Sequence, residues 1–205
     1  FRELGTQSAY SATEIANAAT SLALAGYSLD ETKAASEPIL QLTQATCENF
    51  EDMANIVVDG LHEFGMEATE ASRFADVLAK TAISTNTDVQ EMGEALKYAG
   101  AVAGSFGFQI EDLATALGAM ATQGVKGSMA GTALRTTITR LATNVSHARE
   151  AFESIGGSFY DAEGNARSFY DIVSDLRKGM KGLSDEERST IARSEERRVG
   201  KECRS

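Results

Sequence analysis

Apolar residues recur at intervals of three and four along most of this chain, the spacing that places side chains on one face of a helix. The pattern predicts helices over residues 11–25, 29–45, 48–64, 69–83, 89–105, 111–121, 145–155 and 169–180, with a last helix beginning after residue 183. Residues 157–169 differ, since glycines precede and interrupt them, and they predict a short β-hairpin or a tight turn. The expected fold class is therefore all-α.

A short sequence motif, the repeated form, recurs at three helix ends, in residues 24–31, 63–70 and 105–112. Each copy has a glycine, an apolar residue, a spacer and then acidic residues that open the next helix. A glycine just past a helix adopts the left-handed conformation, and the apolar residue then folds back on the last turn. Because the form recurs about every 40 residues, we expect stacked helical hairpins.

Pro38 is the single proline of the chain and lies inside the pattern of residues 29–45. Proline lacks an amide donor and clashes with the preceding turn, so a kink or break is expected near Glu37.

Residues 124–141 join a glycine-rich turn to a helix without a break. Gly124, Gly127 and Gly131 are spaced so that another backbone can approach closely. Ala130, Leu134, Ile138 and Leu141 share one face of the predicted helix, and Thr132, Thr136, Thr139 and Thr143 form a second, polar stripe. The residue types indicate a packing element and not an active site.

The 205 residues carry a net charge of -11, and this acidity disfavours direct binding to nucleic acid. No apolar run approaches the ~18 residues that span a bilayer. The chain opens at Phe1 without an initiator methionine, so a fragment of a longer protein is expected. Two cysteines, Cys47 and Cys203, make no disulfide framework and favour a reducing compartment, with Cys47 expected as a small buried residue.

The last thirteen residues, 193–205, change abruptly to a dense mix of charges without hydrophobic period. They resemble the translation of a common sequencing-adapter oligonucleotide, and we interpret them as an artefactual tail; the alternative is a genuine basic tail. The expected organisation is a helical core over residues 1–155, a turn or hairpin plus a closing helix over 156–192 in the same region, and the tail over 193–205.

No arrangement of residues predicts catalysis, a cofactor or a metal ion. The segment Asp161–Asn165 has the composition of a calcium loop, but its glycine is misplaced for an EF-hand and a turn is favoured. Residues 124–128 lack the order and the preceding strand of a phosphate-binding loop. His62 and His147 stand apart from other metal-ligating residues. The sequence thus favours a structural or interaction protein over an enzyme.

Residues 88–100 (Asp-Val-Gln-Glu-Met-Gly-Glu-Ala-Leu-Lys-Tyr-Ala-Gly), Phe106-Gly107 and residues 117–135, with Leu141, resemble the core region of phage tail tape measure proteins of the TP901 type. Ile155-Gly156, Tyr160-Asp161, Gly164-Asn165, Phe169 and Asp171-Ile172 match the usual close of that region. The resemblance covers residues 1–192.

The resemblance implies a helical, non-enzymatic virion component that lies in the tail lumen and, during assembly, in the host cytoplasm. Such proteins set tail length, and tail-tube subunits polymerise around them with the help of tail assembly chaperones. They leave the tail before or during DNA ejection and contact the host envelope. The resemblance makes residues 124–141 the most diagnostic segment, with packing or self-association as the role of Gly124, Gly127, Ser128, Gly131, Thr132, Leu134 and Ile138.

Two hypotheses of different classes follow. The first is the core of a tape measure protein from a phage or prophage. The second is a helical-hairpin module of a cellular protein that binds a partner through a groove. An enzyme acting through Asp161 or His147 ranks third.

Overall fold

The computed structural model describes residues 12–24, 26–143 and 147–186, and over this part of the chain it contains helices and no strand. The helices are α2 (Ala12–Leu24), α3 (Leu29–Thr46), α4 (Phe50–Phe64), α5 (Ala71–Ser84), α6 (Val89–Ser105), α7 (Ile110–Thr122), α8 (Gly127–Ala142), α9 (His147–Ser154) and α10 (Phe169–Lys181). A 3-10 turn, η1 (Ala68–Glu70), precedes α5. The predicted all-α class is confirmed; the helix expected after residue 183 and the 193–205 tail fall largely or wholly outside the described residues.

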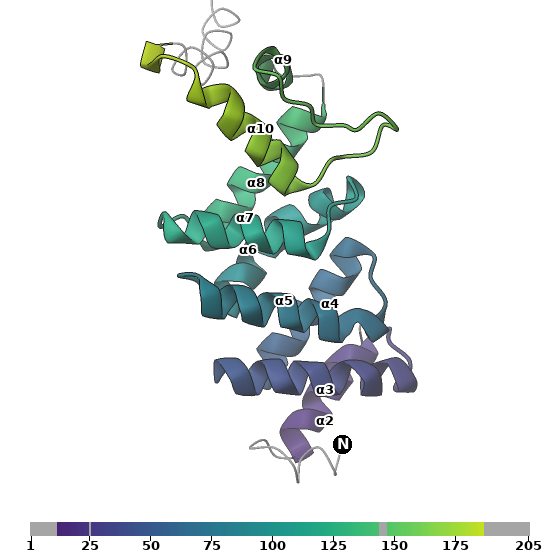
Figure 1. The fold of residues 1–205 in the computed structure, drawn as a ribbon. Coiled ribbons are helices and arrows are strands. Elements are labelled where there is room, and N and C mark those ends of the chain that lie inside the picture. The colour runs from purple at the N-terminus through teal and green to yellow at the C-terminus, as the bar shows by residue number, and fades with distance from the viewer. Residues whose placement is uncertain (1–11, 25, 144–146, 187–205) are drawn as a thin grey trace, which may run out of the picture.

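The helices form hairpins that stack in two layers. In Figure 1, α3, α5 and α7 lie one above another in front, while α2, α4, α6 and α8 follow each other behind them. Neighbours within each layer contact one another, most extensively α6 and α8, and α10 continues the front layer beyond α7. The predicted stacking of helical hairpins is confirmed.

The repeated form marks the turn inside each of the first three hairpins. In each turn, the amide of the apolar residue donates a hydrogen bond to a carbonyl five residues earlier: Tyr27 to Leu22, Met66 to Leu61 and Phe108 to Ala103, at 3.2, 2.8 and 3.1 Å. The preceding residue is a glycine with positive φ, namely Gly26, Gly65 and Gly107. This is the helix-ending motif that the sequence predicted. Helices α7 and α9 end in the same way at Gly124 and Gly156.

Helix α3 runs unbroken through Pro38, so of the expected kink or break near Glu37 the break is wrong. Proline deprives the carbonyl of Ala34, four residues earlier, of its helical partner. Ala34 is exposed, so that carbonyl can bind water at little cost.

Cys47 is exposed, and the expectation of a buried cysteine is also wrong. It follows the end of α3 in the left-handed conformation, with φ of 57°, where the other such turns carry glycine.

Residues 157–169 fold as a tight turn closed by an isolated antiparallel bridge between Tyr160 and Ala166. The carboxylate of Asp161 accepts hydrogen bonds from the amides of Glu163 and Asn165 at 3.0 and 2.8 Å, which accounts for the calcium-loop composition as turn chemistry. The fully buried Phe159 packs edge-on against Phe106 and Phe108, so this segment closes over the α6–α7 turn.

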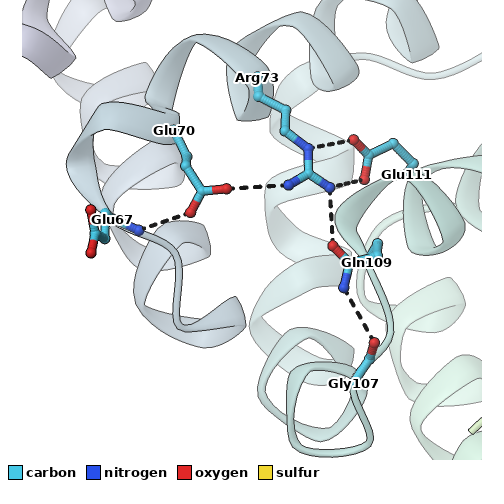
Figure 2. A network of polar contacts seen from close by, with 6 residues as sticks. All are labelled: Glu67, Glu70, Arg73, Gly107, Gln109 and Glu111. Carbon is cyan, nitrogen blue, oxygen red and sulfur yellow. Dashed lines mark hydrogen bonds and ion pairs between the residues drawn. The ribbon is translucent and has the colours of Figure 1, made fainter.

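A polar network fastens the second hairpin to the third (Figure 2). Arg73 of α5 donates two hydrogen bonds to Glu111 at the start of α7, from Nε at 2.7 Å and from an amino group at 2.8 Å. It also donates to Glu70 at 3.2 Å and to Gln109 at 3.0 Å. The bonds from Arg73 lower the pKa of Glu111. The network therefore fixes the spacing of α5 and α7 at their N-terminal ends.

Candidate interaction surface

Helix α8 carries the residues that the sequence singled out, and the structure separates them into three groups. Gly124 and Gly127 have positive φ and form the turn into the helix. Gly131, Leu134 and Ile138 lie on the buried face, with 3 % of Leu134 and 1 % of Ile138 exposed. Ser128 and Thr132 lie on the opposite, exposed face. Ser128 and Thr132 are therefore the two whose side chains reach a surface where a partner could bind.

Gly131 lies where α8 crosses α6. A Cβ added at this position would lie 2.9 Å from both Cα and the carbonyl carbon of Ala95, and still closer to its carbonyl oxygen. Real Cβ contacts of this kind to backbone do not occur, so the crossing depends on glycine. The buried face of α8 thus serves packing within the chain, against α6.

The outer face of α8 is less polar than its threonines suggest. The hydroxyl groups of Thr136, Thr137 and Thr143 donate to the carbonyls of Thr132, Ala133 and Thr139 at 2.8, 2.9 and 2.7 Å. Because these donors are used within the helix, the surface presents mainly methyl groups to solvent.

A shallow, open groove of about 660 Å³ runs along this face. It is lined by Tyr98 of α6 and by Ser128, Met129, Thr132, Ala133, Thr136 and Thr137 of α8. Met129 is 65 % exposed and Tyr98 45 % exposed, which is high for large apolar side chains on packed helices. Arg135 and Arg140 of the same helix are exposed outside the groove lining and give α8 positive charge.

A second groove, of about 270 Å³, lies between α4 and α6 and is acidic. Its lining includes Asp52, Ile56 and Asp59 from α4 and Glu94 and Lys97 from α6. Lys97 pairs with Glu94 at 2.7 Å. Asp52 and Asp59 have side chains without an ion pair or hydrogen bond to any other described residue.

Beside this groove, the half-buried Glu63 packs on glycines of α6. A Cβ at Gly100 would lie 2.8 Å from the carboxyl carbon of Glu63, so glycine at this position leaves room for the side chain where it lies. One of its carboxyl oxygens is buried without a hydrogen-bond partner among the described residues. Burial, and then the charge of Asp59, raise the pKa of Glu63 to about 7, against the opposing effect of Lys97.

The residues considered for chemistry do not assemble elsewhere in the described part of the chain. His62 stacks on Tyr27, with ring centroids 5.3 Å apart, and the side chain of His147 lies outside what the structure describes. No three His, Cys, Asp or Glu side chains of the described residues group as metal ligands. Among those residues, too, no helix has the length and apolar character needed to cross a membrane.

Sequence reasoning missed Tyr98, Met129 and Glu63. Tyr98 and Met129 lie off the apolar faces of their helices, and this position could have marked them as exposed apolar residues. Glu63 could have been linked to α6 through Gly93, Gly100 and Gly104, whose spacing places three glycines on one face of that helix.

Comparisons with known proteins place the chain among phage tail components. The family of phage-related minor tail proteins matches residues 1–194. The tape measure protein of Pneumococcus phage Dp-1 is 36% identical over 187 residues, which make up 91% of this chain and 16% of that protein. The probable tape measure protein of Escherichia phage P2 is 31% identical over 176 residues, 86% of this chain and 22% of that protein. The resemblance to phage tail tape measure proteins is thereby confirmed.

The chain thus spans about a fifth or less of the length of these relatives. No solved structure matches it.

Proposed function

The chain belongs to the phage-related minor tail protein family, and we propose that it is a segment of a tail tape measure protein. The observation that carries the proposal is the match of the family to residues 1–194, together with two relatives named as tape measure proteins. The chain is accordingly a structural component of the phage tail. The alternative, a groove-binding module of a cellular protein, has no comparable observation in its favour.

In the role proposed, the full-length protein lies in the lumen of the tail and determines its length. Tail-tube subunits polymerise around it, tail assembly chaperones accompany it in the host cytoplasm, and copies of it self-associate. It leaves the tail as DNA is ejected and meets the host envelope. The segment acts through packing and not through catalysis, in keeping with helices whose glycine crossings and buried core serve one continuous stack.

The stacked form has a direct consequence for tail length. Packed helices lie 8–10 Å apart, so one hairpin of about 39 residues adds roughly 9 Å to a stack. The same residues in one continuous helix would add about 58 Å, at 1.5 Å per residue. We propose that this segment stays stacked in the tail, because its layers share a core that extension would expose, including Leu61, Phe74 and Leu78. The segment then adds little to the length of the tail, and the rest of the protein determines most of that length.

Tail length measured by electron microscopy tests both parts of the proposal. In the full-length gene of the phage itself, residues 50–88 would be deleted, which removes α4 and α5 and leaves the flanking hairpins to stack on each other. The stacked form predicts tails shortened by roughly 9 Å, and triplicating the unit should lengthen them by roughly 18 Å. A deletion of equal size outside the segment serves as the control.

The outcomes separate the two parts. A shortening near 58 Å would overturn the stacked form and retain the tape measure assignment. Infectious particles with tails of wild-type length after loss of the whole gene would overturn the assignment itself.

A further inference from the structure

The charges of this chain are divided along the stack. Residues 12–112 contain seventeen acidic and four basic side chains, whereas residues 113–149 contain no Asp or Glu and four basic residues. The acid-free segment includes all of α8. A net charge of -11 therefore conceals a helix whose outer surface carries only positive charge.

The acidic and the basic surface belong to one face of the molecule, with α6 between them. On α6, Gly93 and Gly100 meet α4, and Ala95 meets α8. The exposed side of α6 contributes Glu94 and Lys97 to the acidic groove and Tyr98 to the groove on α8. We call this face, made by the exposed sides of α4, α6 and α8, the outer face.

We propose that the outer face is the interface between two copies of this chain, related by a two-fold axis that runs along α6. This inference deepens the self-association proposed above and depends on it. A two-fold axis in this position lays α8 of one copy over α4 of its partner, and the reverse contact follows by symmetry.

Charge complementarity selects a second copy as the occupant. Asp52 and Asp59 on α4 form no ion pair within the described residues, and the nearby Lys97 pairs with Glu94, so this groove keeps a net negative charge. Arg135 and Arg140 are exposed on α8, on the far side of α6. After rotation about the two-fold axis, the second copy presents its charges in the reverse order. The acidic surface of each copy then faces the basic surface of the other, which gives two equivalent contacts. An interface of this kind is self-complementary and closes at two copies.

The apolar part of the outer face has the same symmetry. Met129 and Tyr98 stand out on the α8 side, and the acidic groove on the α4 side has the partly buried Ile56 in its lining. In the proposed dimer, the exposed methyl groups of α8 and Met129 are removed from water against this groove. Large exposed apolar side chains that charged residues surround are typical of interfaces.

The test uses the complete 205-residue chain in sedimentation velocity over a range of concentrations. The wild type should form a dimer that weakens as salt rises. The first variant reverses the charge of α8 (Arg135→Glu with Arg140→Glu), and the second reverses the charge of α4 (Asp52→Lys with Asp59→Lys). Each variant alone should dissociate at least tenfold more readily than the wild type. An equimolar mixture of the two should dimerise as well as the wild type, because both contacts of the mixed dimer are again between opposite charges.

A matched control changes charges that lie elsewhere on the molecule, away from the outer face. Lys33→Glu with Asp30→Lys changes exposed charges at the start of α3, in the front layer, and should leave dimerisation unchanged. Circular dichroism melts of every variant confirm that the fold is kept, since all these side chains are exposed.

Three results would overturn the proposal. They are a wild type that stays monomeric at every concentration, masses that grow beyond two copies as in an open polymer, and a mixture that dimerises no better than its two components. A monomeric wild type would point instead to an acidic segment of another tail protein as the partner that binds the exposed surface of α8. None of these results bears on the tail-length experiment, so the two proposals fail separately.

Discussion

Replacing Gly131 with alanine tests how closely α8 approaches α6. On an exposed helix this change stabilises by about 1 kcal/mol, since alanine has the higher helix propensity. Here the new methyl group would lie 2.9 Å from two backbone atoms of Ala95, and backbone cannot rotate away as a side chain can. Contact at about 3.8 Å then requires the helices to separate by roughly 1 Å.

The cost of that separation exceeds the gain in propensity. Overpacking costs up to about 3 kcal/mol, and the separation also loosens the contacts of Leu134 and Ile138 with the core. Subtracting the gain leaves a net loss of about 2 kcal/mol in the free energy of unfolding. For a chain of this size the loss corresponds to a fall of about 4–8 °C in melting temperature. Gly131→Leu should prevent the crossing from forming at all.

Urea unfolding followed by circular dichroism at 222 nm measures the loss. Gly182→Ala is the matched control, because a Cβ at Gly182 meets nothing within 4 Å and its φ of -92° suits any residue. The control should change stability by less than about 0.5 kcal/mol. Wild-type or greater stability of Gly131→Ala would refute the close crossing.

Two further predictions concern single side chains. The folded pKa of Glu63, about 7, lies above its ordinary value of 4.5, so the stability that its protonated form contributes is complete below pH 4.5 and is lost as pH rises to 7. The free energy of unfolding of Glu63→Gln should therefore match that of the wild type near pH 4.5 and exceed it by about 1 kcal/mol at pH 8, allowing for the solvent that reaches this half-buried group. Thermal melts at the two pH values measure the difference. An equal gain in stability at both pH values would contradict the prediction. Cys47→Gly should stabilise the chain by about 1 kcal/mol, because φ of 57° favours glycine; a lower urea midpoint than wild type would contradict the assignment of strain to this residue.

The helices and their ends were readable from the sequence because their causes are local. Apolar spacing determines which segments form helices, and a glycine followed by an apolar residue determines where they end. The limits of α6, Val89–Ser105, agree with the pattern residue for residue. Pro38 and Cys47 departed from expectation for reasons that depend on the surroundings. The carbonyl that Pro38 frees belongs to the exposed Ala34, and Cys47 occupies a turn and not a helix.

The candidate surface was only partly readable. Gly131 could be assigned to a close approach, but the sequence does not say whether the approaching backbone belongs to this chain or to another. The structure identifies Ala95 of α6 as the neighbour. The charge division escaped notice because net charge averages over the chain, and because only the order α4, α6, α8 places Asp59 and Arg135 on one face.

The small residues of α6 connect the packing of the chain to its proposed interface. Gly93 and Gly100 let Ile56 and Glu63 of α4 approach on one side, and on the other side Ala95 lies against Gly131 of α8. A Cβ at Gly93 or Gly100 would meet side-chain atoms that can shift, whereas a Cβ at Gly131 would meet the backbone of Ala95 and move α8, with its basic surface, away from α6. The spacing of the charges in the proposed dimer is thus determined by the same glycines that determine the helix crossings. It follows that Gly131→Ala should weaken dimerisation even at temperatures where the fold persists, whereas Gly182→Ala should not. Sedimentation of both variants below their melting temperatures distinguishes this dependence from a simple loss of folded protein.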